Sequence, residues 1–202
     1  MKMYRLPIVV VCAALLSTAA FAQESSPAAP HIVGPQPFHA NFAAVSVNKD
    51  DFGFTTTPLF NGTSGAIRAS ATLSGDGTHG HFTGQGVFEA IYTNPARACT
   101  QPGGAAGIAA LYKGFVLVMT FDSAQDQLFL ALSSGSDCFN PIAHVSTGQA
   151  TFSVVGGTGR FEGATGTLVN PYKAIFLAAS ALGPNGLFNA ISGTFDGFIT
   201  LK

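Results

Sequence analysis

Polar and apolar residues alternate with a period of two over most of the chain from Phe38 onward, and no other feature constrains the fold as strongly. In segment 64–74, one face carries mainly Ser, Thr and Arg, and the other carries Gly, Ile, Ala and Leu. Segments 82–92 and 148–155 alternate in the same way. Successive side chains of a β-strand point to opposite faces, so this period predicts strands rather than amphipathic helices.

Turn-forming residues interrupt these segments at short intervals. They are Gly-Asp-Gly at 75, Asn-Pro at 94, Asp-Ser at 122, Gly-Ser-Asp at 135, Gly-Gly-Thr-Gly at 156, Asn-Pro at 170 and Gly-Pro-Asn-Gly at 183. Many short strands separated by such turns are typical of a β-sandwich or a β-barrel. Segment 174–182 fits either a strand or a buried helix, and its composition does not decide between them.

Three segments, 114–121, 127–133 and 174–182, are apolar on both faces. A strand of an antiparallel sheet with two apolar faces needs cover on both sides. One face would fill the interior of a barrel. A second sheet, the N-terminal segment or another copy of the chain would cover the other face, so a homo-oligomer is one of the expectations.

The first 22 residues have the composition of a secretory signal. A basic start precedes a short apolar run, and Ala20-Phe21-Ala22 fits a cleavage site. We expect cleavage after Ala22, no membrane span in the mature protein, and a secreted or periplasmic location. Residues 23–37, rich in Pro, Ser and Ala, are expected to be a disordered lead-in to one domain at 38–202.

The charge balance argues against nucleic-acid binding. Without the signal's Lys2 and Arg5, seven of the nine basic residues remain against ten acidic ones, for a net charge of −3. A nucleic-acid partner requires a positive surface, and the sequence contains no basic run. A polybasic membrane anchor is disfavoured for the same reason.

Cys99 and Cys138 are predicted to form a disulfide, since both lie in turn-like segments of an exported chain. The bridge would enclose 38 residues, and the loop entropy would stabilise the fold by at most about 4 kcal/mol. His79 and His81 have the spacing of a metal pair but no third ligand at a suitable position, so we interpret them as part of a solvated turn and expect no metal or other cofactor.

The segment VVGGTGRFEGATG, residues 154–166, lacks the spacing of a nucleotide-binding loop. A dinucleotide loop requires Gly-x-Gly-x-x-Gly. Counted from Gly157, the third position holds Glu162, and counted from Gly156, the second holds Thr158. We therefore interpret the segment as a turn between two strands. Its expected turn residues are Gly156 and Gly157 with positive φ, Thr158, Gly159, the apolar anchor Phe161, and Gly163.

The same region, FSVVGGTGRFEGATGTL at 152–168, resembles the signature of the allene oxide cyclase and dirigent barrel superfamily. Segments 75–88, 119–132 and 193–201 resemble other strands of bacterial secreted members. The resemblance extends over about 38–202 in layout, but only 152–168 is specific. It implies an all-β, eight-stranded antiparallel barrel around an apolar cavity, often trimeric. It assigns no catalytic residue, because the polar cavity positions of the plant enzymes have no match here.

A barrel of this size can hold one small ligand, and we expect a small apolar molecule to be bound inside. Weak candidates are Glu89 and Tyr92 for catalysis, and Arg68, Gln85 and Tyr112 for ligand binding. The alternatives are a trimeric structural or adhesion module without a ligand, and a cofactor-free cyclase, isomerase or dirigent-type protein. The deciding feature is the face of 82–92 that points inward. Its aromatic residues would fill the barrel, whereas Thr83, Gln85 and Glu89 would line a polar pocket.

Overall fold

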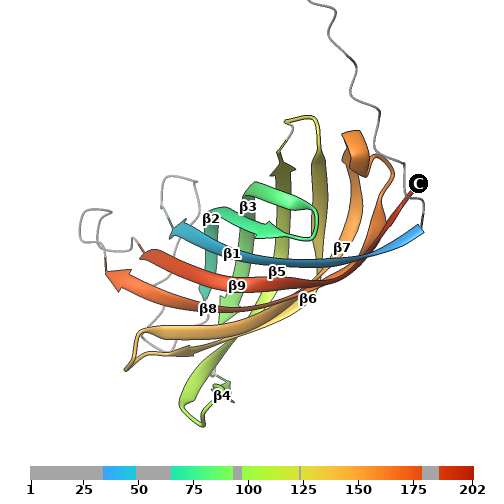
Figure 1. Cartoon of the computed structure of the whole chain (residues 1–202). Coiled ribbons are helices and arrows are strands. Elements are labelled where there is room, and N and C mark those ends of the chain that lie inside the picture. Colours follow the sequence, from blue (N-terminus) through green and yellow to red (C-terminus); the bar gives the residue numbers. More distant parts are fainter. Residues whose placement is uncertain (1–33, 49–64, 93–96, 123, 179–186) are drawn as a thin grey trace, which may run out of the picture. The chain divides into compact units, whose positions relative to one another are not determined.

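The computed structural model describes residues 34–48, 65–92, 97–122, 124–178 and 187–202. The expected signal peptide and most of the expected lead-in lie outside these residues. No helix in the described part is long and apolar enough to cross a membrane. The described elements, shown in Figure 1, are β1 Gly34–Asn48, β2 Gly65–Gly77, β3 Gly80–Tyr92, β4 Ala98–Thr100, β5 Ala106–Phe121, β6 Gln127–Asn140, β7 Val145–Thr158, the 3-10 turn η2 Gly159–Phe161, β8 Thr165–Ala178 and β9 Leu187–Leu201.

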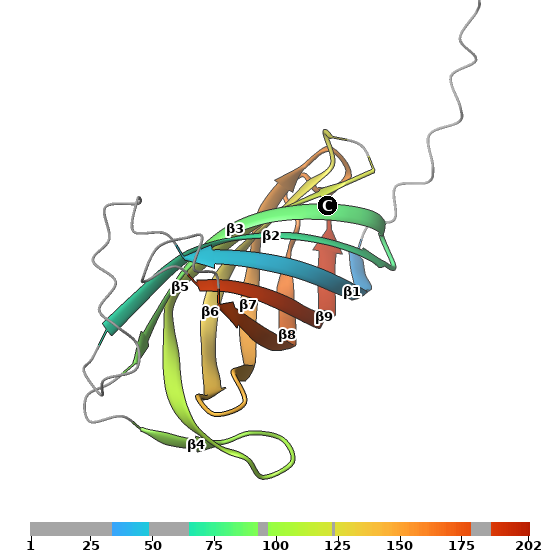
Figure 2. The same ribbon diagram turned by 90° about the vertical axis from the view of Figure 1, so that its left-hand side faces the viewer.

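Eight of the nine strands in the described residues form a closed antiparallel barrel. The strand order is β3-β2-β1-β9-β8-β7-β6-β5, and β3 also pairs with β5, which closes the sheet on itself. The short strand β4 pairs with β5 at one end (Figure 2). Each barrel strand therefore pairs with its neighbours in the sequence, and β9 returns to β1. The predicted all-β, eight-stranded antiparallel barrel is confirmed, and segment 174–182 is a strand as far as Ala178.

Strand β1 begins before the expected start of the domain. Gly34 pairs with Leu201 and Pro37 pairs with Phe198, so residues 34–37 belong to the barrel rather than to a disordered lead-in. The Pro-rich composition of this segment indicated disorder and therefore a boundary at Phe38. Proline is nevertheless tolerated at the beginning of a strand, so β1 can start earlier.

Several of the predicted turns lie inside strands, and Gly-Asp-Gly at 75 forms the end of β2. Gly-Ser-Asp at 135 belongs to β6 and Asn-Pro at 170 belongs to β8. Pro171 has no N–H to donate, and the β8–β9 ladder is interrupted between Val169 and Tyr172. At this interruption the Asn170 side chain donates from Nδ2 to the Thr194 carbonyl at 2.6 Å. A side-chain hydrogen bond thus reinforces the strand pair where the main-chain ladder fails.

The segment 154–166 contains a turn between β7 and β8, as predicted, but the turn spans 159–164, because Gly156, Gly157 and Thr158 still belong to β7. Gly156, Gly159 and Gly163 have positive φ, whereas Gly157 does not. A Cβ at position 157 would lie 2.3 Å from the Gln127 carbonyl oxygen, so glycine is needed there for close approach. Phe161 belongs to η2 rather than to a resumed strand, and its side chain is fully buried.

The end of the barrel that this turn closes is filled with aromatic and aliphatic side chains, and we call it the packed half. The rings of Phe121 and Phe161 lie 4.7 Å apart, and those of Phe82 and Phe121 lie 5.7 Å apart. Other buried residues of this half include Phe38, Met119, Leu128 and Ile199. Burial alternates along β3, so Phe82 and Phe88 point inward, while Thr83, Gln85 and Glu89 lie on the outer face.

The outer faces of the doubly apolar strands are not covered by the described part of the chain. In segment 114–121 Val116 is 54% exposed, and in segment 174–182 Ile175 and Leu177 are each 46% exposed. The apolar outer faces predicted from the sequence are therefore present in the barrel, and no second sheet among the described residues packs on them.

Candidate ligand-binding site

Two irregularities in strand pairing turn polar side chains toward the interior at the other end of the barrel. Strand β5 contains one extra residue opposite Glu89 and Ala90 of β3. The alternation of β5 is reversed beyond this residue, so Tyr112 and Phe115 both face inward. In β6 the pairing with β7 shifts between Leu132 and Ser134. Beyond that shift Asp137 lines the interior, because an extra residue in one strand reverses its alternation.

A row of paired residues brings Asp137 and Tyr172 together. Asp137 pairs with Gly148, and Gly148 pairs with Tyr172. A Cβ at position 148 would lie 2.2 Å from the Tyr172 hydroxyl oxygen, so that hydroxyl lies directly over the glycine. Gly135 makes room in the same way for Tyr112, whose Cδ2 would be 2.8 Å from an added Cβ. The two glycines therefore leave the space that the two tyrosine rings occupy.

The polar side chains form one hydrogen-bonded chain. The hydroxyls of Tyr112 and Tyr172 lie 2.5 Å apart. The Tyr172 hydroxyl also lies near the Asp137 carboxyl, and hydrogen bonding from Tyr172 and from the Cys138 N–H lowers the pKa of that carboxyl. Ser146 donates from its hydroxyl to Asp137 Oδ1. Four side chains from β5, β6, β7 and β8 are thus joined across the barrel wall.

Burial governs the protonation of this chain. It raises the pKa of the Asp137 carboxyl, although hydrogen bonds from Ser146, Tyr172 and the Cys138 N–H oppose the shift. Burial also raises the pKa of Tyr112, and the Asp137 charge adds to this shift. The pKa of Tyr172 is raised by burial and by both neighbours. The two tyrosines are therefore neutral hydrogen-bonding groups at physiological pH.

These groups border a small cavity of about 40 Å³. We call this end of the barrel the polar half, defined by Ser46, Tyr112, Asp137, Ser146, Tyr172 and Asn189. Aromatic rings of Phe88 and Phe176 line the same cavity. A second cavity of about 40 Å³ shares Phe88, Tyr112, Tyr172 and Ile191 with the first and is otherwise mostly apolar.

Asn189 and Ser46 form the buried side of this cavity. Asn189 is 6% exposed and donates from Nδ2 to the Ser46 hydroxyl oxygen at 2.8 Å. Its Oδ1 is buried and accepts no hydrogen bond. A buried carbonyl oxygen without a donor is costly in an apolar interior, and such groups are usually paired with a donor.

The predicted disulfide is present beside the polar half. Cys99 and Cys138 are bonded, with 5.9 Å between their Cα atoms. Gln101, also from the β4 region, donates from Nε2 to the Cys138 and Val145 carbonyls at 2.7 and 2.9 Å. These contacts fasten β4 to the ends of β6 and β7, next to Asp137.

Of the five candidate site residues, Tyr112 is the one that the structure places in the interior cluster. Gln85 and Glu89 lie on the outer face, so Glu89 is not the inward carboxylate that a catalytic role would require. The side chains of Arg68 and Tyr92 lie outside the described residues, and only their backbones are placed: Arg68 pairs with Glu89, and Tyr92 pairs with Ala110.

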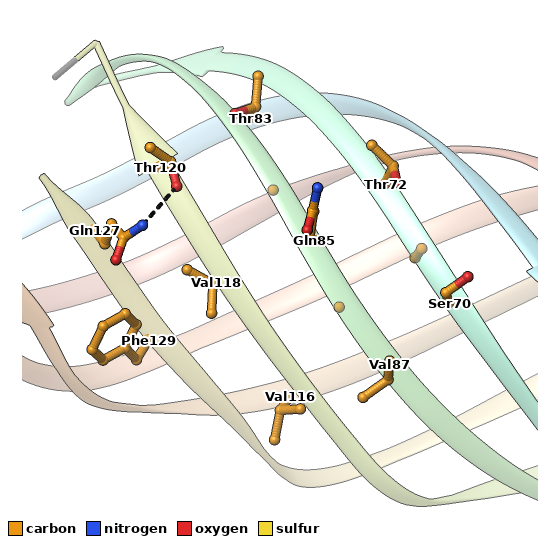
Figure 3. A pocket seen from close by; sticks show the side chains of 13 residues that line it. Ser70, Thr72, Thr83, Gln85, Val87, Val116, Val118, Thr120, Gln127 and Phe129 are labelled. Carbon is orange, nitrogen blue, oxygen red and sulfur yellow. Dashed lines mark hydrogen bonds between the residues drawn. The ribbon is translucent and has the colours of Figure 1, made fainter. Parts of the chain in front are cut away.

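Gln85 lines a hollow on the outside of the wall formed by β2, β3, β5 and β6 (Figure 3). This outer groove has a volume of about 820 Å³. Val87, Val116 and Val118 form its apolar part. Hydroxyl and amide side chains form the rest, and Gln127 donates to Thr120 at 3.3 Å. None of the described residues lining it carries a charge.

His79 is not the solvated residue that the sequence suggested. Its ring stacks on Phe38 at 5.4 Å and meets Phe161 edge-on at 5.8 Å. Burial, with the Arg160 charge as the second cause, lowers the pKa of His79. His81 is exposed and lies 3.1 Å from Asp76. Among the described residues, no cluster of three His, Cys, Asp or Glu side chains has the geometry of a metal site.

The sequence reasoning missed Asp137, Ser146, Tyr172, Asn189 and Ser46. Asp137 ends the turn-forming triplet Gly-Ser-Asp, and Tyr172 follows an Asn-Pro pair that also indicates a turn. The available signal was the pair of glycines, Gly135 and Gly148, in otherwise strand-like segments. Glycine inside a strand often marks a place where another group approaches closely. Comparison of the chain with family models, curated proteins and solved structures finds no match.

Proposed function

We propose that the protein is an exported barrel that binds a small, largely apolar molecule in its polar half. The observation that carries the proposal is the Asp137 carboxyl joined to two tyrosine hydroxyls at the wall of a cavity. The ligand would place a polar group against this cluster and its apolar part in the adjoining cavity. Mostly apolar walls with a few convergent polar groups are characteristic of ligand sites.

The energetics of the cluster support a functional role. Burying ionisable groups costs free energy, and an apolar replacement of similar shape is often as stable or more stable. The packed half shows that this barrel can fill most of its interior with apolar side chains. Ionisable groups with shifted pKa values gather preferentially at functional sites. The polar cluster is therefore better explained by a ligand than by stability.

The cavities limit the size of the ligand. Each holds about 40 Å³, which is room for one or two water molecules or for a group of a few heavy atoms. The small size also predicts modest affinity, because binding free energy per heavy atom has an upper limit of about 1.5 kcal/mol.

Native mass spectrometry of the protein purified from its own host, followed by NMR titration of small apolar probes, tests the proposal. We expect bound small molecules or chemical-shift changes around Tyr112 and Asp137. Tyr172→Phe should weaken binding, because it removes only the hydroxyl. Ser133→Ala is the matched control, since it removes an exposed hydroxyl that contacts Ser153 on the outer face. Equal loss of binding in both variants, or no binding by the wild type, would contradict the proposal.

A second candidate is a structural module without a ligand. The observation that favours it is the packed half, where Phe82, Phe121 and Phe161 fill the interior. If the wild-type protein takes up no probe and contains no ligand when isolated, this account is the better one.

Association of copies through the outer groove is compatible with both candidates, and we propose it for that surface. Val87 and Val116 on adjacent strands are each 54% exposed and lie in a groove without charges. Val116→Lys should lower the molar mass measured by light scattering. Val155→Lys, at a site 62% exposed outside the groove, is the control. If only Val155→Lys makes the oligomer dissociate, the interface between copies lies outside the outer groove.

Two finer proposals concern kinship and chemistry. The motif at 152–168 supports membership of the allene oxide cyclase and dirigent superfamily, and the barrel is compatible with it. If the protein is an enzyme, Asp137 is the group suited to transfer a proton, in a cofactor-free isomerisation. Turnover that Asp137→Asn leaves unchanged would rule out this assignment.

A further inference from the structure

Two groups of the polar half, the Asp137 carboxyl and the Asn189 Oδ1, are hydrogen-bond acceptors available to a ligand. With Asp137 ionised, the hydroxyl protons of Ser146 and Tyr172 are directed to its carboxylate, and that of Tyr112 is available to the Tyr172 oxygen. Asn189 donates one Nδ2 proton to Ser46, and its Oδ1 accepts no hydrogen bond. A ligand group that contacts Asp137 and the Asn189 Oδ1 would therefore have to supply the protons of those hydrogen bonds.

The cavity also lacks positive charge. None of the described residues that line it is Lys, Arg or His. Its walls carry one carboxyl group, and the rings of Phe88, Tyr112, Tyr172 and Phe176 lie around it. Aromatic rings attract cations through their faces, and this attraction strengthens where water is excluded.

We propose that the ligand's polar group is a protonated amine, held by the Asp137 carboxylate and the Asn189 Oδ1 within the aromatic lining. An ammonium group supplies a positive charge, three donors and no acceptor, which is the complement of this cavity. The volume of about 40 Å³ admits an ammonium group with its first carbon. The adjoining cavity, bordered by Phe42, Leu73 and Ile191, would take a short alkyl or aryl continuation.

This inference rests on the proposed binding of a small molecule and names its chemical class. An alcohol has the same shape but carries no charge, and a carboxylic acid has the opposite charge. The series propylamine, propanol and propionate therefore separates charge from size. At pH 7 the amine is protonated, and the full-length mature protein is titrated with each compound by NMR.

We expect propylamine to shift the resonances of Asp137 and Asn189, with affinity micromolar at best, and propionate to leave them unchanged. Asp137→Asn keeps the shape and should weaken propylamine binding by about tenfold or more, the effect of a lost hydrogen bond to a charged group. Asn189→Leu should weaken it by about fivefold. Asp76→Asn, which removes an exposed acid outside the cavity, is the control and should have no effect.

Each alternative result has a defined meaning. Propanol binding as tightly as propylamine, or propylamine binding unaffected by Asp137→Asn, would overturn the amine assignment and leave the proposed binding function standing. Binding of none of the three probes, nor of any larger apolar one, would overturn both. If Asp137→Asn does not fold, Asn189→Leu decides, since the proposal fails if this variant binds propylamine like the wild type.

Discussion

The two halves of the barrel interior are built from the same strands but carry opposite chemistry. In the packed half, rings such as Phe121 and Phe161 lie 4.7 Å apart, and the Arg160 guanidinium covers both from 5.2 and 5.0 Å. In the polar half, Asp137 and two tyrosines border a cavity. The difference teaches that one end supplies most of the apolar burial while the other holds groups whose burial is costly. A division of this kind predicts different responses to mutation, pH and reduction.

The largest effect is expected from a truncation in the packed half. Phe161→Ala removes a fully buried ring and should lower the free energy of unfolding by roughly 3–5 kcal/mol, through lost burial and the cavity left behind. Denaturant unfolding measures the change. Phe198→Ala is the matched control, because Phe198 is 63% exposed and its loss should cost less than about 0.5 kcal/mol. Similar effects of both substitutions would contradict the assignment of stability to the packed half.

Loss of the disulfide should act on the polar half. Replacing Cys99 and Cys138 by Ser frees β4 from β6 and should lower stability by at most about 4 kcal/mol, the loop entropy of the enclosed segment. Unfolding of the double variant, compared with wild type before and after reduction, measures it. Hydrogen exchange should increase first near Asp137 and Gln101. Faster hydrogen exchange confined to the packed half would contradict this prediction, because the disulfide would then stabilise the packed half instead of the polar half.

A smaller effect is expected at the turn that closes the packed half. Gly157→Val should destabilise by about 1–3 kcal/mol, because the added Cβ would lie 2.3 Å from the Gln127 carbonyl and 2.6 Å from the Phe161 Cβ. Gly114→Val is the control, since no atom lies within 4 Å of a Cβ at that position. Thermal unfolding of the two variants distinguishes close approach from a general intolerance of valine in these strands.

The smallest effect concerns the pH dependence of the polar half. The folded pKa of Asp137 is raised above its unfolded value by burial. Its stabilising contribution is therefore complete below the usual Asp pKa and is lost as pH rises through the raised folded pKa, by ~1.4 kcal/mol for each pH unit that separates the folded pKa from the unfolded one. Asp137→Asn lacks this loss, so its stability relative to wild type should increase as pH rises from about 4. Parallel pH profiles for the two proteins would show that the carboxyl is not perturbed.

Local sequence patterns predicted the class of fold correctly because their causes are local. The period of two follows from strand geometry, and the glycines at 159 and 163 mark a turn that needs positive φ. The same reasoning failed at Pro171 and at Gly-Ser-Asp 135. There, hydrogen bonds to neighbouring strands keep the chain extended in spite of turn-forming residues.

The sequence by itself determined an all-β domain, the doubly apolar strands, the turn at 154–166 and the Cys99–Cys138 pair. Only the tertiary structure decided which side chains enter the barrel. The register shifts beside Ala90 and Ser134 exist only in the pairing of two strands, and each reverses the alternation beyond it. Tyr112 and Asp137 thereby turn inward, and Tyr172, from a strand about 35 residues further on, reaches Asp137 over Gly148. No segment of the sequence contains this site, because its geometry depends on the register between strands.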